Sequence, residues 1–109
     1  MVTATLTTSH EDGALALTLA VENDGDEPVT AQFRDAQRVE FVATRDGDEV
    51  WRWSAGRMFG QALGTLELAP GETATFDGEW PDPPAGSYTI RGELAATDLA
   101  VSDERTVEL

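Results

Sequence analysis

Apolar and polar residues alternate with a period of two along most of the chain. The clearest run covers residues 14–22, where Leu15, Leu17, Leu19 and Val21 alternate with small or polar residues. Successive side chains of a β-strand point to opposite faces, so this period is typical of strands with one buried face. Almost no segment has the 3.6-residue period of an amphipathic helix. The alternation therefore predicts an all-β protein.

Turn-forming residues divide this pattern into short strands. Asp46-Gly47 is typical of a tight hairpin turn, because both residues tolerate positive φ angles, and Pro70-Gly71 is a second break. The segments that we expect to be strands are residues 2–8, 14–22, 29–33, 38–44, 49–54, 65–68, 72–80, 87–95 and 105–109. Seven to nine short strands, with a turn about every 8 to 12 residues, predict an antiparallel immunoglobulin-like β-sandwich. A small β-barrel is the alternative.

Two stretches lack the alternation and are expected to be loops. Residues 55–63 carry Gly56 and Gly60, and we predict a loop with one helical turn. Residues 81–86 contain three prolines, which cannot donate a hydrogen bond to a β-ladder. This second segment is predicted to lie outside the sheets.

Chain length and composition limit where the protein can act. A length of 109 residues predicts one domain, covering residues 1–109. Cysteine is absent, which excludes disulfides, thiol nucleophiles and thiolate metal sites. No run approaches the roughly 18 apolar residues of a membrane span, and the N-terminus lacks the segments of a signal peptide. We expect a cytoplasmic protein.

The charge is strongly negative. Twenty-one acidic residues stand against seven basic ones, for a net charge of −14, and every basic residue is Arg. Such a surface disfavours nucleic acid and anionic membranes as partners, because both bind through clustered cations. It also repels itself in dilute buffer, and this repulsion is screened at molar salt. An acidic surface without Lys therefore predicts a halophile's cytoplasm.

The order and spacing of several short motifs resemble one known family. The most specific motif is Trp51-Arg52-Trp53-Ser54, followed a few residues later by Met58-Phe59. The other matching residues are Asn23, Glu27-Pro28-Val29, Phe33, Gln37, Phe41, Asp46-Gly47, Gln61-Ala62-Leu63, Leu68-Ala69-Pro70-Gly71-Glu72, Trp80 and Gly86-Ser87-Tyr88. Over residues 14–95 the chain is similar to the BsuPI family of intracellular proteinase inhibitors.

This resemblance implies a fold and a function. It implies an immunoglobulin-like sandwich that inhibits an intracellular subtilisin-like serine protease, but it assigns no reactive-site residue. One departure is visible: the family tends to have an aromatic-Asp-Phe run in its fourth strand, where this chain has Val39-Glu40-Phe41. The departure leaves the predicted fold unchanged and bears on local contacts only.

No residue pattern predicts catalysis or a metal site. His10 is the one histidine, and we expect it to be solvated in a turn at residues 9–13 rather than part of a catalytic triad. The acidic turns at residues 24–27 and 46–49 suggest calcium, but neither follows the EF-hand pattern. The remaining carboxylates are expected on turns and polar strand faces. No catalytic residue, metal ligand or cofactor is predicted.

Two groups of large apolar residues are candidates for the core or for partner binding. At least two of Trp51, Trp53 and Trp80 are expected to pack in the core. The best candidate binding segment is residues 54–61, in which Arg57, Met58 and Phe59 are predicted to contact a partner. The alternative is that Met58 and Phe59 fold back and cap the open end of the sandwich. Residues 81–85 form a second candidate loop.

Three functions are consistent with these features. The first is a cytoplasmic inhibitor that occludes the active site of a subtilisin-like protease, with Met58 or Phe59 in the primary specificity pocket. The second is a non-inhibitory protein-binding module with the same fold. The third is a small enzyme or metal-dependent domain, which would require carboxylates gathered around His10.

Overall fold

The computed structural model describes residues 1–109 as nine β-strands and no helix. The strands are β1 (Val2–Glu11), β2 (Ala14–Asn23), β3 (Val29–Phe33), β4 (Val39–Arg45), β5 (Asp48–Arg52), β6 (Gly64–Leu68), β7 (Thr73–Pro81), β8 (Ser87–Leu94) and β9 (Ser102–Glu108). The all-β prediction is confirmed. Since no helix is present, none could span a membrane.

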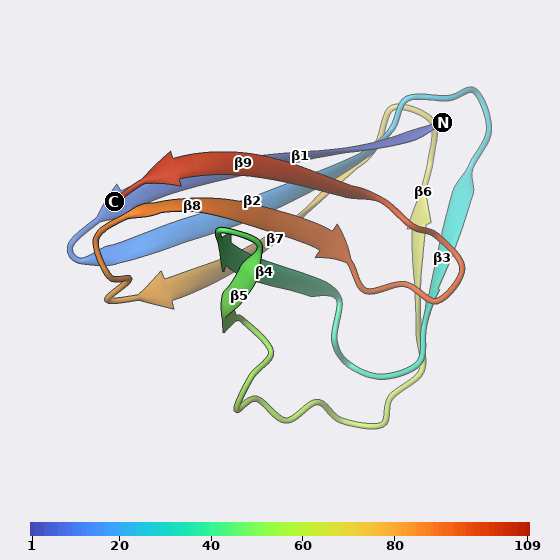
Figure 1. The fold of residues 1–109 in the computed structure, drawn as a ribbon. Helices are drawn as coiled ribbons and strands as arrows, with labels where there is room; N and C mark the ends of the chain where they lie inside the picture. Colours follow the sequence, from blue (N-terminus) through green and yellow to red (C-terminus); the bar gives the residue numbers. More distant parts are fainter.

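The strands form three antiparallel sheets arranged as a sandwich (Figure 1). A three-stranded sheet has the order β1-β2-β7, and a four-stranded sheet has the order β5-β4-β8-β9. The small sheet β3-β6 extends the molecule at one end. At one side β1 and β9 lie next to each other, and Asp103 and Arg105 bond to the backbone of Leu6 there. The predicted sandwich is therefore correct, and the barrel alternative is not.

The alternation explains which side chains are buried. All four apolar residues of β2 that we assigned to one face, Leu15, Leu17, Leu19 and Val21, are at most 1% exposed. They meet Phe41, Ala43 and Ile90 of the facing sheet in one continuous core. Burial of these faces supplies the main driving force for the fold.

The ring of Phe41 requires two glycines, one on the adjacent strand β8 and one on β7 of the other large sheet. Phe41 is 0% exposed and lies opposite Gly92 in the β4–β8 register. A Cβ atom added to Gly78 on β7 would lie 2.7 Å from this ring, and one added to Gly92 would lie 3.3 Å from it. These glycines leave the space that the ring fills between the two sheets.

The tight turns follow the predicted chemistry. Asp46 and Gly47 both have positive φ angles, 52° and 85°, as the hairpin between β4 and β5 requires. Asp12 and Gly13 form an equivalent turn between β1 and β2, with φ angles of 51° and 77°. His10 therefore lies within β1, not in the turn where we expected it.

Several boundaries differ from the prediction. Strand β5 ends at Arg52, so Trp53 and Ser54 lie outside it, and β9 begins at Ser102 rather than at Arg105. Pro81 is the last residue of β7, where its missing N–H costs the ladder little. Residues 55–63 contain no helical turn; two separate turns close at their start instead.

Strand β4 is buried on both faces, although its alternation predicted one buried face. Residues Val39 to Ala43 are all buried, including Glu40 at 7% exposure. One face packs in the core, and the other lies beneath the chain that leaves β5. Glu40 is therefore an internal carboxylate at the foot of a long loop.

Candidate partner-binding site

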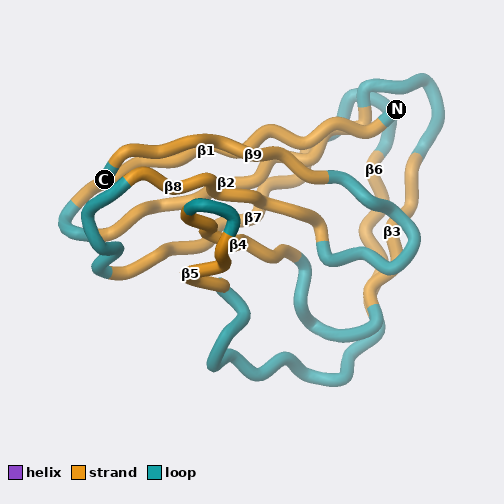
Figure 2. Tube along the Cα trace, viewed as in Figure 1, coloured by secondary structure: helices purple, strands orange, loops and turns teal.

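A long loop connects the four-stranded sheet to the small sheet. This segment, residues 53–63, is called the crossing loop here and links β5 to β6. Figure 2 shows it as an uninterrupted stretch of loop that extends away from the sandwich. It contains the three predicted partner-binding residues, Arg57, Met58 and Phe59.

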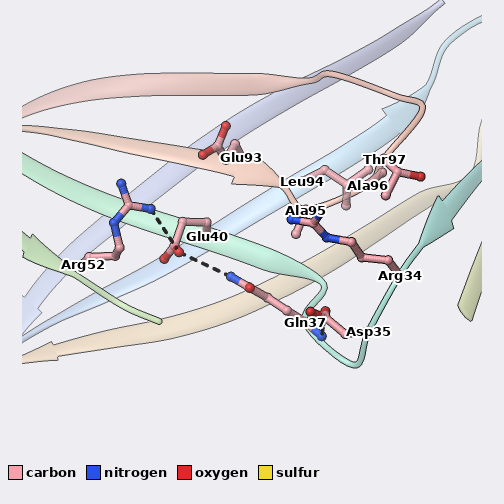
Figure 3. Close-up of a pocket in the computed structure, with 10 residues that line it drawn as sticks. All are labelled: Arg34, Asp35, Gln37, Glu40, Arg52, Glu93, Leu94, Ala95, Ala96 and Thr97. Atoms are coloured by element: carbon pink, nitrogen blue, oxygen red, sulfur yellow. Dashed lines mark hydrogen bonds and ion pairs between the residues drawn. The ribbon is translucent and has the colours of Figure 1, made fainter. Parts of the chain in front are cut away.

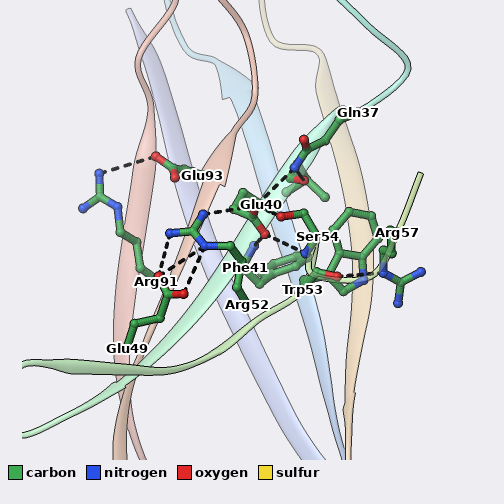
Figure 4. Close-up of polar contacts among 11 residues, drawn as sticks. Gln37, Glu40, Phe41, Glu49, Arg52, Trp53, Ser54, Arg57, Arg91 and Glu93 are labelled. Atoms are coloured by element: carbon green, nitrogen blue, oxygen red, sulfur yellow. Dashed lines mark hydrogen bonds and ion pairs between the residues drawn. The ribbon is translucent and has the colours of Figure 1, made fainter. Parts of the chain in front are cut away.

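Glu40 holds the first residues of the crossing loop (Figure 4). Its carboxylate accepts hydrogen bonds from the Ser54 backbone N–H at 3.1 Å and from the Ser54 hydroxyl. It also accepts from the Phe41 N–H at 3.1 Å, from Arg52 at 3.2 Å and from the Gln37 amide at 3.3 Å. A buried carboxylate with this many donors is fully paired, so it fixes the positions of the groups around it.

Arg52 carries its positive charge between two carboxylates. Its Nη1 lies 3.2 Å from Glu40, and its Nη2 lies 2.7 Å from Glu49. The hydrogen bond from Arg52 lowers the pKa of the Glu49 carboxyl below its ordinary value. The same bond, with a smaller contribution from Glu40, raises the pKa of Arg52. The charge of Arg52 is thus balanced within the protein.

Trp53 joins the crossing loop to the core. Its ring meets the ring of Phe41 edge to face, with 6.2 Å between centroids. The Trp53 ring also contacts Phe59, at a centroid distance of 5.9 Å and a tilt of 42°. The guanidinium carbon of Arg57 lies 4.3 Å from the Trp53 ring centroid, and Arg57 Nε donates to the Trp53 carbonyl at 2.8 Å. Trp53 therefore supports both neighbours of Met58.

Met58 itself touches almost nothing. Its side chain is 98% exposed, and Leu63 further along the loop is 83% exposed. The alternative in which Met58 and Phe59 fold back therefore does not hold for Met58. It holds for Phe59, which is partly buried against Trp53. Of the three predicted residues, Arg57 and Met58 face solvent and Phe59 supports the loop from inside.

The crossing loop is also held beyond Met58. The Gly60 carbonyl accepts a hydrogen bond from the Ala36 N–H at 2.9 Å. No backbone–backbone hydrogen bond involves Met58 or Phe59, which lie between the contacts at Ser54 and Gly60. None involves residues 61–63, which follow Gly60. Their backbone groups are thus free to pair with an extended segment of another protein.

A polar hollow of about 440 Å³ lies beside Glu40 (Figure 3). Its lining residues are Arg34, Asp35, Gln37, Glu40, Arg52, Glu93, Leu94, Ala95, Ala96 and Thr97. The hollow opens widely to solvent and contains few apolar groups, unlike the concave apolar sites that bind small molecules. Nowhere in the structure are three or more His, Asp or Glu side chains placed to hold a metal ion.

The remaining sequence candidates lie apart from the crossing loop. His10 is exposed on β1 opposite Leu15 and belongs to no group of three or more His, Asp or Glu side chains placed to hold a metal ion. Residues 81–85 begin with the end of β7, and the Pro84 carbonyl accepts a hydrogen bond from the buried Tyr88 hydroxyl at 2.8 Å. No large apolar side chain of that segment is exposed.

The three tryptophans differ in how deeply they are buried. Trp80 is 5% exposed, and Trp51 stacks on it at 5.2 Å with an interplanar angle of 13°. Trp53 packs against the core through Phe41. The expectation of at least two core tryptophans therefore holds fully for Trp80 alone, because Trp51 and Trp53 are half-buried and pack against the core from outside it.

The residue that sequence reasoning missed is Glu40. Its place between Val39 and Phe41 put it on the predicted solvent face of β4, so no role was assigned to it. A signal was present, because the family resemblance already pointed to an acidic residue at this position. The Val39-Glu40-Phe41 departure keeps that acid and lengthens it by one methylene.

Comparison with known proteins identifies the family. The family model of BsuPI, described as intracellular proteinase inhibitor, matches residues 2–99. The chain belongs to the BsuPI family. The resemblance seen over residues 14–95 is thereby confirmed and extends over β1. No curated protein matches the chain.

Solved structures share the fold of this BsuPI domain. A calcium-binding mutant of Bacteroides uniformis β-glucuronidase 2 aligns with a TM-score of 0.53 and 17% identity, over 99% of this chain and 13% of that one. A crystal structure of Bacteroides uniformis β-glucuronidase gives 0.52 and 16%, with the same coverage of 99% and 13%. The chain thus spans 13% of the length of these enzymes, and at this identity the likeness supports the β-sandwich alone.

Proposed function

We propose that this BsuPI protein inhibits an intracellular subtilisin-like serine protease by placing the crossing loop in its active-site cleft. Met58 would enter the primary specificity pocket, where subtilisin-like enzymes favour large apolar side chains. The protein would act by stoichiometric occlusion and would perform no chemistry of its own. Membership of a proteinase-inhibitor family supports the class of partner.

The observation that carries this proposal is the exposure of Met58 between two held points of the loop. A 98% exposed methionine is the side chain most available to an external pocket. Because Ser54 and Gly60 are bonded to the body of the protein, binding would order few additional residues. This pre-organisation increases affinity by reducing the entropy lost on association.

The free backbone of the loop supports the same mode of binding. Extended substrates and inhibitors add a strand to a protease cleft, so main-chain hydrogen bonds give affinity and side-chain pockets give selectivity. Residues 58, 59 and 61–63 have unused backbone groups for this pairing. A stable complex would bury roughly 1,200–2,000 Å² in total, which requires the surface around the loop to contribute as well.

The test is an inhibition assay in molar KCl. A purified intracellular subtilisin-like protease is titrated with the full chain, and hydrolysis of a peptide substrate is followed. We expect stoichiometric inhibition by the native chain and by Met58→Leu, and an inhibition constant at least about 100-fold higher for Met58→Asp. Thr106→Asp, at an exposed position of β9 on the opposite edge of the four-stranded sheet from β5, adds the same charge away from the crossing loop and is the control, which should retain inhibition.

Two outcomes would contradict the proposal in different ways. Undiminished proteolysis at several-fold excess of the native chain would contradict inhibition itself. Equal inhibition by Met58→Asp and the native chain would contradict insertion of this residue. Binding to a partner without loss of its activity would favour the alternative, a non-inhibitory interaction module with an immunoglobulin-like fold.

A further inference from the structure

The crossing loop lies in the longest segment of the chain without an acidic residue. Residues 50–66 form a run of 17 positions with no Asp or Glu, and no other such run is longer than 10. The protein has 21 acidic residues in 109, so this gap is conspicuous in a chain of net charge −14. The segment contains two cations, Arg52 and Arg57, and of these Arg52 is already balanced by Glu40 and Glu49.

Arg57 has no carboxylate partner within the protein. Arg52, Arg91 and Arg105 each lie within 4.0 Å of an acidic side chain, whereas Arg57, like Arg34, Arg38 and Arg45, does not. Of these four unpaired arginines, only Arg57 lies in the crossing loop. Acidic residues outnumber arginines three to one in this chain, with 21 against 7. An exposed arginine left unpaired in such a chain, directly before the exposed Met58, is available to an external anion.

The guanidinium of Arg57 is held in place through Nε, and its two terminal amino groups make no hydrogen bond within the protein. It lies over the Trp53 ring at 4.3 Å, and Nε donates to the Trp53 carbonyl at 2.8 Å. Figure 4 shows its two terminal amino groups pointing away from the Trp53 ring. A guanidinium presents donors in a planar fork that matches a carboxylate, and a stacked one loses less entropy on binding.

We infer that the surface bound by the crossing loop carries a carboxylate beside its apolar pocket, and that Arg57 pairs with it while Met58 fills the pocket. This inference rests on the proposed function and specifies the target. The protease would have an Asp or Glu side chain lining the subsite for the residue that precedes Met58. The contact would be a two-bonded ion pair between the Arg57 amino groups and that carboxylate.

The distribution of charge determines which face of this protein an acidic partner would meet. The rest of this protein is strongly negative and repels an acidic protein over distances comparable with the screening length. Residues 50–66, the segment without an acidic residue, would present apolar side chains and the unpaired Arg57 to an acidic cleft. Complementary charge of this type orients the encounter and rejects other orientations.

The test compares variants of Arg57 against a subtilisin-like protease that has an acidic residue at this subsite. We expect Arg57→Gln to raise the inhibition constant about 10- to 100-fold and Arg57→Glu to raise it further. Arg57→Lys should give an intermediate value, because a lysine cannot form the planar two-bonded pair. Arg105→Gln, on β9, removes one charge elsewhere and is the control, with inhibition unchanged.

Exchanging the two charges, on the protease and at residue 57, distinguishes a direct ion pair from a structural role of Arg57 in the loop. Replacing the acidic subsite residue of the protease by Lys should weaken inhibition by the native chain and restore inhibition by Arg57→Glu. A structural effect of Arg57 on the loop would give no such restoration. Melting temperatures of all variants, measured in the same buffer, confirm that the fold is intact.

The outcomes distinguish the two proposals. If the native chain inhibits, Met58→Asp does not, and Arg57→Gln matches the native chain, the loop inserts as proposed and the inference about Arg57 is wrong. Absence of restoration in the charge exchange would also overturn it. If the native chain fails to inhibit the protease, the proposed function is wrong and this inference is overturned with it.

Discussion

The carboxylate of Glu40 receives both the backbone N–H and the hydroxyl of Ser54, and so fixes the foot of the crossing loop to strand β4. Glu40 is buried in the middle of a central strand, whereas Ser54 is the second residue beyond β5. The loop therefore leaves the sandwich from a rigid point. For an inhibitor this matters because a loop that stays ordered binds a cleft tightly and is cut slowly.

Glu40→Gln is expected to loosen the loop. The amide keeps the size of the carboxylate, but its NH₂ group faces donors on Ser54 and Arg52 and cannot accept from them. Loss of charged hydrogen bonds should reduce the free energy of unfolding by about 2 kcal/mol, measured by urea denaturation. We also expect about 10-fold weaker inhibition and faster cleavage near Met58.

Ser54→Ala is the matched control for this change. It removes the hydroxyl donor but keeps the backbone N–H that bonds to Glu40, so a loss of about 1 kcal/mol is expected. If Glu40→Gln left both the stability and the cleavage rate unchanged, the carboxylate would not be what positions the loop.

The fold was predictable because alternation is set by local geometry. In β2 every second residue faces the core, so Leu15 and Val21 could be placed from the sequence alone. The same rule failed at Glu40, because the chain that leaves β5 turns back over the outer face of β4 and places Ser54 on Glu40. Alternation describes one strand and its two faces, and it contains no information about which faces the loops later cover.

The site was predictable in part for a similar reason. Loss of alternation located the loop, and large apolar residues within it drew attention to Met58 and Phe59. Their different fates depend on Trp53, whose ring provides a surface for Phe59 and not for Met58. The position of that ring is set by its contact with Phe41, which lies between glycines of two other strands. Such a relation appears only when the strands are assembled.

Asn23→Asp is expected to be strongly destabilising although the two side chains have nearly the same shape. Asn23 is 0% exposed, and its Nδ2 donates to the carbonyls of Glu27 at 2.7 Å and Leu68 at 2.9 Å. A carboxylate oxygen in that place would face two carbonyl oxygens with no hydrogen to share. We expect a loss of about 3 kcal/mol or more in the free energy of unfolding at pH 7.

The control for this prediction is Gln32→Glu, which adds the same charge at an exposed position of β3. Its effect should stay within about 0.5 kcal/mol, as for most surface changes. Similar losses for both variants would mean that added negative charge, and not the buried hydrogen bonds, determines the result.

Trp51→Ala should open the side of the sandwich where β5 and β7 meet. These are the edge strands of the two larger sheets, and the Trp51 ring stacks on Trp80 at 5.2 Å across them. Because Trp51 is partly exposed, the expected loss is about 2 kcal/mol, below the range for a fully buried tryptophan. Val50→Ala, at the exposed neighbouring position, should change urea stability little. Equal effects of the two substitutions would contradict a closing role for the stack.

Salt should stabilise this protein, because its charge of −14 is spread over 109 residues. Repulsion among these carboxylates opposes the folded state at low salt, and a screening length of roughly 3 Å at 1 M removes most of it. We expect the melting temperature to rise by about 10 °C or more between 50 mM and 2 M KCl. Neutralising the exposed pair Asp46→Asn and Asp48→Asn should raise the low-salt value and flatten the dependence, since Asn tolerates the positive φ at residue 46. A melting temperature indifferent to KCl would remove the case for a salt-rich cytoplasm.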